Sequence, residues 1–179
     1  RQNSDPCALF HAMIHPLAPY AIRGALWYQG ESNLGAGDTD IYIDKTRALI
    51  GGWRKVWGQG DFPFYFVQLA PFTYKHEPTR LPEFWAAQTK AAETIPNTGM
   101  AVINDIGDFK DIHPKNKQEV GRRLALLALA KTYGLKMKDY TGPQFKSFST
   151  KGDLLGIKFD HVGDGIKSSN GKDLTGFEI

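Results

Sequence analysis

The chain has 179 residues, 41% of them hydrophobic, which is enough for one well-packed core. The formal net charge is only +3 and the Lys and Arg residues are scattered, so we expect no nucleic-acid partner. No apolar run is long enough to cross a bilayer, so we expect no membrane insertion, and the single Cys7 excludes an internal disulfide or a Cys-based metal cluster.

The chain opens at Arg1 without an initiator Met and closes on a strand-like phrase, LTGFEI. We therefore expect an internal segment of a longer protein. Residues 6–20 predict a short helix or turn, broken by Pro16 and Pro19. Ile22–Tyr28 follows as a near-continuous apolar run, which is typical of a strand covered on both faces.

Further along the chain, strands and helices alternate. The polar stretch 29–37 predicts a turn, and two more apolar runs predict strands. Apolar positions at helical spacing predict three helices. The expected helices are 38–57, 82–95 and 116–133, and the expected strands after the first are 62–69 and 100–104. Asn116 and Glu119 resemble a capping box at the start of the last helix.

This alternation predicts a parallel sheet with right-handed crossovers. We expect an α/β fold with three layers, α/β/α, over residues 1–138. The pattern of apolar and polar residues changes at about residue 139. From there, short segments in which apolar and polar residues alternate are separated by Gly, Asp, Asn and Lys. Residues 139–179 therefore predict the start of a second, β-rich and β-sandwich-like region. Its expected strands are 145–149, 154–159 and 175–179.

Polar residues follow two of the expected strands. In open parallel sheets, sites form beyond the carboxyl ends of the strands, so these two loops are expected to converge. The first loop supplies Gln29, Gly30, Glu31 and Asn33. The second supplies Asn104, Asp105, Asp108, Asp111 and His113.

The motif Asp111-Ile112-His113-Pro114 is the strongest indication of a catalytic residue in the second loop. Pro114 disfavours helical geometry for His113, so this residue is expected to be extended just ahead of a helix. An Asp111 carboxylate on one ring nitrogen leaves the other nitrogen free to accept a proton from a nucleophile. The alternative is that Asp111 is a loop residue and His113 only packs at the start of the helix.

In the first loop, side-chain amides and backbone N–H groups suit an oxyanion site, although a hydrogen-bonded turn explains the same residues. Ser32 is not the expected nucleophile. The phrase Gly30-Glu31-Ser32-Asn33-Leu34 lacks the second Gly of the G-x-S-x-G elbow, and several loop residues are expected to follow Ser32 before any helix.

Three motifs occur in order, WYQGESN, RLPEFWAAQ and DIHPKNKQEVGRRLA, and FDHVGDGI and LTGFEI follow near the C-terminal end. In these motifs the chain resembles the sialate O-acetylesterase group of the SGNH hydrolases. The resemblance implies a three-layer α/β/α fold. It also implies hydrolysis of O-acetyl esters on carbohydrates by a serine nucleophile, without a cofactor. The partner it implies is an acetylated carbohydrate. Relatives of this type are generally exported, so a periplasmic or extracellular location is expected.

The resemblance assigns residues as well. His113 matches the general base of the family, and Gln29, Gly30, Glu31 and Asn33 match its oxyanion block. Lys110 stands where the family has its acid, three residues before the His, so Asp111 is the nearest orienting acid, with Asp108 or a backbone carbonyl as alternatives. The nucleophilic Ser belongs to a G-Q-S-N-like phrase that these residues lack. We expect the serine upstream and this chain to be inactive alone.

Three other functions use the same residues. Glu31 with Asp108 or Asp111 suits the acid and base of a glycoside hydrolase. A metal site from acids of the second loop and His113 is another interpretation. A non-catalytic carbohydrate-binding module is the third. Neither the preferred sugar nor the oligomeric state follows from these residues.

Overall fold

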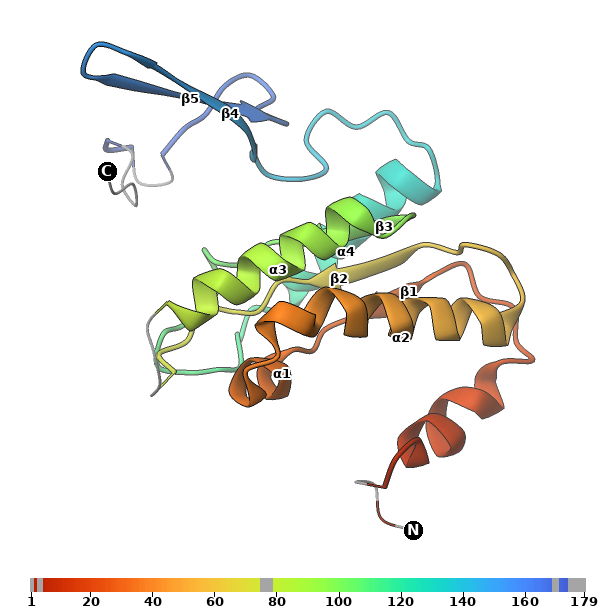
Figure 1. The fold of residues 1–179 in the computed structure, drawn as a ribbon. Coiled ribbons are helices and arrows are strands. Elements are labelled where there is room, and N and C mark those ends of the chain that lie inside the picture. The colour runs from red at the N-terminus through yellow and green to blue at the C-terminus, as the bar shows by residue number, and fades with distance from the viewer. Residues whose placement is uncertain (1, 3–4, 75–78, 169–170, 174–179) are drawn as a thin grey trace.

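A parallel three-stranded sheet forms the centre of the molecule in the computed structural model, which describes residues 2, 5–74, 79–168 and 171–173 (Figure 1). The strands are β1 (Ala25–Trp27), β2 (Phe64–Val67) and β3 (Thr98–Ala101), in the order β1-β2-β3. All three run parallel, with Ala25 opposite Phe64 and Phe64 opposite Thr98. The carboxyl ends of the strands therefore lie at one edge of the sheet.

Helices cover both faces of this sheet. The alternating side chains of β2 show why, because all four of its residues are buried. Phe64 and Phe66 pack with Ile50 of α2 (Tyr42–Trp57) and Ala91 of α3 (Arg80–Thr94) on one face. On the other face, Tyr65 and Val67 pack with Val120, Leu124 and Leu127 of α4 (Lys117–Leu127). The predicted three-layer α/β/α fold is confirmed.

The helices begin and end largely where expected. Helix α2 follows a short 3₁₀ turn, η3 (Thr39–Ile41), and ends at Gly58, whose positive φ of 63° suits a left-handed cap. At the start of α4, the backbone N–H of Glu119 donates to Asn116 Oδ1 at 3.1 Å, which is half of the expected capping box. The Glu119 side chain binds Arg122 and Arg123 instead of completing the box, and α4 continues into a π-turn, η4 (Ala128–Thr132).

Two strands differ from expectation. Strand β1 is shorter than the predicted Ile22–Tyr28, and it is not covered on both faces, because Leu26 is 63% exposed on this edge strand. Strand β3 begins at Thr98, two residues before the predicted strand 100–104, and ends at Ala101. The Thr98 hydroxyl donates to Ile95 O at 2.8 Å, and Gly99 lies close against the Tyr65 ring, where a side chain has little room. Tertiary contacts thus bring a Thr-Gly pair into the sheet.

The prediction of a turn over residues 29–37 is wrong for part of this stretch. Glu31–Ala36 forms a helix, α1, which is joined to the end of β1 by three residues. Gly30 precedes it with φ of 156°, and a Cβ there would lie 3.0 Å from Phe84 Cε1 and 3.2 Å from Leu69, so any other residue would be strained. Leu34 anchors the helix because its buried side chain packs with Leu69 and Phe84.

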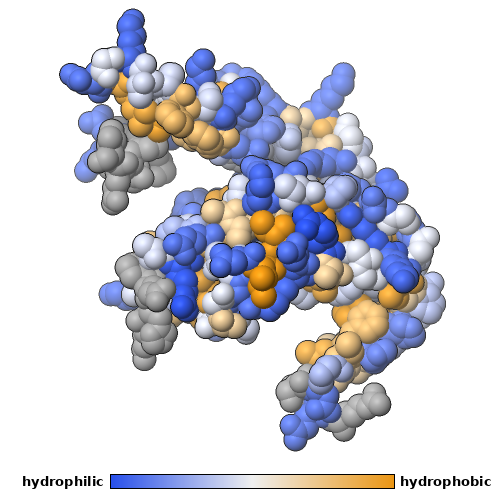
Figure 2. Space-filling model, in the orientation of Figure 1, coloured by the Kyte–Doolittle hydropathy of each residue, from blue (hydrophilic) through white to orange (hydrophobic). Residues whose placement is uncertain are grey.

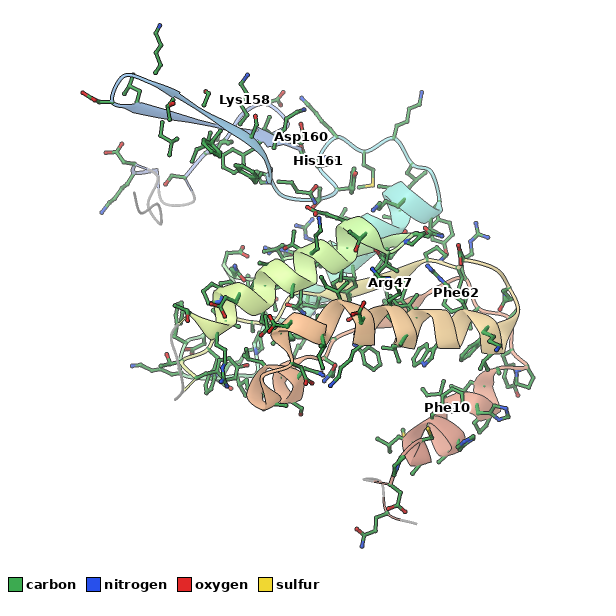
Figure 3. All side chains as sticks on the ribbon, viewed as in Figure 1. Phe10, Arg47, Phe62, Lys158, Asp160 and His161 are labelled. Atoms are coloured by element: carbon green, nitrogen blue, oxygen red, sulfur yellow. The ribbon has the colours of Figure 1, made fainter. Side chains whose placement is uncertain are left out.

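Two parts of the chain extend from the sheet. The N-terminal turns η1 (Phe10–Ile14) and η2 (His15–Leu17) project at one end, where Figure 3 labels Phe10. At the other end lies an antiparallel hairpin of β4 (Gln144–Lys151) and β5 (Leu154–Asp160). Apolar side chains gather on this hairpin in Figure 2, Phe145, Phe148 and Leu154 among them. The predicted strand 175–179 lies outside the described residues.

Candidate functional site

Four polar side chains form a chain of hydrogen bonds at the carboxyl end of β1. Lys45 Nζ donates to Asp38 Oδ2 at 2.6 Å, and Asn33 Nδ2 donates to the same oxygen at 2.8 Å. Gln29 Nε2 then donates to Asn33 Oδ1 at 2.9 Å. The hydrogen bond from Lys45, followed by that from Asn33, lowers the pKa of Asp38. Two expected site residues, Gln29 and Asn33, thus belong to one network.

Gly30 and Glu31 contact each other directly. The backbone N–H of Gly30 donates to Glu31 Oε2 at 3.0 Å. This amide, expected as an oxyanion donor, therefore already has an acceptor. Glu31 also lies near two tyrosines whose hydroxyls are buried and have no hydrogen-bond partner among the described residues, Tyr28 and Tyr74. Burial, followed by the charge of Glu31, raises the pKa of each to about 12, so both stay neutral donors.

The second loop holds His113 through its backbone. Asp111 Oδ1 accepts the backbone N–H of His113 at 3.0 Å, while His113 Nδ1 lies 3.8 Å from that oxygen, beyond hydrogen-bond reach. The imidazole itself is 86% exposed. The expected hydrogen bond from the His113 ring to Asp111 is therefore not formed, although the two groups lie close together. The Asp111 carboxylate instead holds the main chain in an Asx turn. The ring is free to meet a group from outside the described residues.

The other acids of this loop have structural partners. Asp105 binds Arg123 through both carboxylate oxygens, at 2.6 and 2.7 Å, and this hydrogen bonding lowers the pKa of Asp105. Asp108 Oδ1 accepts the backbone N–H of Lys110 at 2.8 Å. Within the described part of the chain, no group of three or more His, Cys, Asp or Glu side chains is placed to hold a metal ion. The metal-site interpretation thus finds no support there.

The loops that carry the two halves of the site lie at the same edge of the sheet, because they follow the carboxyl ends of the parallel strands β1 and β3. Lys117, four residues after His113, places its ammonium 5.0 Å from the centroid of the Tyr28 ring. Gly107 lies so close to Pro71 that an added Cβ would approach the proline ring to 2.3 Å. These contacts link the start of α4 to the end of β1, and the loop after β3 to the loop after β2. Across the described residues, however, no hydrogen bond joins His113 to the stretch 29–33.

A small cavity borders the Gln29 network. Its volume is about 170 Å³, and it lies between the end of β1 and helix α2. The lining residues are Trp27, Gln29, Asn33, Tyr42, Lys45, Thr46 and Leu49. The cavity therefore borders the Gln29 end of the network. Over the described residues, no helix is both long and apolar enough to cross a membrane.

Sequence reasoning missed three residues that shape this region. Asp38, Lys45 and Tyr74 are absent from the predicted site, yet Asp38 and Lys45 belong to the hydrogen-bond network and the Tyr74 hydroxyl is buried near Glu31. Nothing in the spacing of Asn33, Asp38 and Lys45 identifies them as a network, because they belong to different elements. For Tyr74, its place just beyond the predicted strand 62–69 was a usable signal, since that strand ends at the same edge.

Comparison with known proteins identifies the family. The model of "Carbohydrate esterase, sialic acid-specific acetylesterase" matches residues 8–130, which include both halves of the site. Sialate O-acetylesterase of Rattus norvegicus is 37% identical over 85% of this chain and 31% of its own length, and that of Homo sapiens is 39% identical over 78% and 30%. A carbohydrate acetylesterase structure from Xanthomonas citri superposes with a TM-score of 0.77 at 39% identity, covering 85% of this chain and 35% of that one. The chain spans about a third of the length of these relatives, and it belongs to the sialic acid-specific acetylesterase family of carbohydrate esterases.

Proposed function

We propose that the complete protein hydrolyses O-acetyl esters on carbohydrates by serine-based acyl transfer. The observation that carries this proposal is the family match over residues 8–130, because it spans both Gln29–Asn33 and His113. The printed names of the relatives, sialate O-acetylesterase and carbohydrate acetylesterase, agree on the class of reaction. We propose that the serine comes from residues upstream of Arg1.

In the proposed mechanism, the serine hydroxyl attacks the acetyl carbonyl carbon and His113 accepts its proton. Nδ1 of His113 lies on the Asp111 side of the ring, 3.8 Å from Oδ1, and we propose that Nε2 takes the proton while Asp111 approaches Nδ1 in the reacting complex. The C–O bond to the sugar then breaks, and protonated His113 returns the proton to the sugar oxygen. Water repeats the sequence on the acetyl-serine: its proton passes through His113 and acetate leaves. The exposure of His113 supports this role, because its ring is free to meet the serine.

The negative oxygen of each tetrahedral intermediate needs hydrogen-bond donors. Gln29 is the proposed donor. One hydrogen of its Nε2 group is donated to Asn33, and the second has no partner among the described residues. Gly30 and Glu31 serve the site differently. Their mutual hydrogen bond uses the Gly30 amide, and a Glu31 carboxylate only accepts hydrogen bonds. We propose that they fix the start of α1 behind Gln29.

An assay of the complete protein separates this function from its rivals. Purified protein is incubated with an O-acetylated sialic acid, an acetylated xylan and p-nitrophenyl acetate, and released acetate and released sugar are both measured. An esterase releases acetate and leaves glycosidic bonds intact. Cleavage of glycosidic bonds supports a glycoside hydrolase using Glu31 with Asp108 or Asp111 instead. Sugar binding without turnover of any ester supports a carbohydrate-binding module.

Two further expectations remain proposals. We propose that the complete protein is exported, which cell fractionation with an antibody against it tests. We also propose that residues 139–179 begin a separate β-rich region. The exposed apolar side chains of the β4–β5 hairpin support this, because an isolated two-stranded hairpin is at best marginally stable in water.

A further inference from the structure

We infer that Asp38 is a positioning residue for the proposed reaction: held by Lys45, it aims the Gln29 amide through Asn33. This inference rests on the proposed function, because it concerns the group that binds the oxyanion. Asp38 follows α1, and Lys45 lies one turn into α2. Neither residue belongs to the predicted site.

The direction of every hydrogen bond in this network follows from its first member. An Asp38 carboxylate beside a Lys ammonium only accepts hydrogen bonds, so Asn33 must present its NH₂ group to Asp38. Asn33 then presents its carbonyl oxygen to Gln29. Gln29 must answer with its own NH₂ group, at 2.9 Å. Reversing any one amide places two donors or two acceptors face to face.

This order matters because a glutamine amide has two chemically opposite ends. With NH₂ held toward Asn33, the second amide hydrogen of Gln29 remains available to stabilise negative charge. A flipped amide presents its oxygen to part of the same region and repels that charge. Asp38 is well placed to impose the order, because its side chain is only 15% exposed and its pKa is lowered by these partners. Preorganised donors of this kind need no rearrangement during the reaction.

The network lies beside the proposed site and not at a remote surface. Gln29, Asn33 and Lys45 all line the cavity of about 170 Å³ at the end of β1. Small displacements of a catalytic group from its productive position lower the reaction rate by up to about 10²-fold. We therefore expect the loss of Asp38 to act on turnover more than on substrate binding.

The test uses the complete protein and a continuous acetate-release assay. In Asp38→Asn, the new amide has both donors and acceptors, so the order of the network is no longer imposed. The expected result is a fall in kcat of about tenfold or more with KM changed less than about twofold. The matched control is Asp40→Asn, which removes an exposed carboxylate two residues away that has no ion-pair partner among the described residues. Its kcat should stay at the wild-type value.

A double-mutant cycle separates positioning from a structural role. In Gln29→Ala the donor is already absent, so adding Asp38→Asn should cause no further loss of kcat. If Asp38→Asn lowers kcat equally in both backgrounds, or lowers only the melting temperature, the inference is wrong. A wild-type protein that releases no acetate from any ester contradicts the proposed function itself. An active wild-type protein with an unchanged Asp38→Asn variant contradicts only the inference.

Discussion

Glu31 accepts the backbone N–H of Gly30 at 3.0 Å, so the first residue of α1 satisfies the amide that immediately precedes the helix. Gly30 is buried and tightly packed between Phe84 and Leu69. A buried amide without a partner is costly, so this contact stabilises the turn from β1 into α1. The same turn carries Gln29, and its geometry therefore matters to the site as well as to the fold.

Replacing Glu31 should destabilise the protein in a graded way. Glu31→Ala leaves the Gly30 N–H unpaired, and we expect the free energy of unfolding to fall by about 1–3 kcal/mol. Glu31→Gln keeps a carbonyl acceptor and should recover most of that loss. Urea denaturation followed by tryptophan fluorescence measures both values. Equal losses in the two variants would show that the charge of Glu31, and not its hydrogen bond, stabilises the turn.

The proposed general base is tested by His113→Ala in the complete protein. Removing a general base costs about 10²–10⁴-fold in rate, so kcat/KM for ester hydrolysis should fall by that range. The fold should be unaffected, because the side chain is 86% exposed. His11→Ala, at an exposed position of η1, is the matched control and should retain activity. Near-normal activity of His113→Ala would overturn the assignment.

Ser32 needs its own test, because the structure removes one of the two arguments against it. The residue was expected in a loop, yet it lies in the first turn of α1, which is joined to β1 by only three residues. The missing second Gly of the elbow is the argument that remains. We expect Ser32→Ala in the complete protein to keep its activity within about twofold, as for an ordinary surface substitution. Loss of activity and of labelling by a serine-directed fluorophosphonate would identify Ser32 as the nucleophile.

The three layers of the fold could be predicted from the sequence, but the hydrogen-bond network that joins Gln29, Asn33, Asp38 and Lys45 could not. Long apolar runs and helical spacing predicted β2, α2, α3 and α4, because burial of one face leaves a periodic record. Helix α1 left none: its six residues hold one buried apolar side chain, Leu34, and its stability comes from tertiary packing. The contact of Asp38 with Asn33 likewise depends on how a turn places two elements. Local patterns do not encode such a contact.

Loss of Arg54, a buried structural residue of α2, should destabilise the fold strongly. Its guanidinium is buried and donates to the carbonyls of Phe62, at 2.9 Å, and Pro96, at 2.8 Å, tying α2 to the starts of β2 and β3. Arg54→Met keeps the packing but leaves these carbonyls without their donor. We expect a loss of about 3 kcal/mol in the free energy of unfolding. Lys55→Met, on the exposed side of the same helix, should change it by less than about 0.5 kcal/mol.

Acid should weaken the link between α4 and the loop after β3. Arg123 joins Glu119 to Asp105, and hydrogen bonding to Arg122 and Arg123 lowers the pKa of Glu119 from 4.5 to about 2. A carboxyl whose pKa is lower in the folded state stabilises the fold above its unfolded value and loses that contribution as the pH falls through its folded value. The pKa of Asp105 is also lowered, chiefly by Arg123, so both groups act in the same direction.

We therefore expect the melting temperature to fall as the pH drops from 4.5 towards about 2, and Asp105→Asn to reduce this dependence. The melting temperature of the variant should lie below that of the wild type near neutral pH, and the two should converge in acid, where the Asp105 of the wild type is protonated. Differential scanning calorimetry across this range measures both curves. Asp153→Asn, in the exposed turn of the β4–β5 hairpin, is the control and should follow the wild type throughout. A constant gap between the Asp105→Asn and wild-type curves at every pH would show that the contact with Arg123 owes nothing to the charge of Asp105.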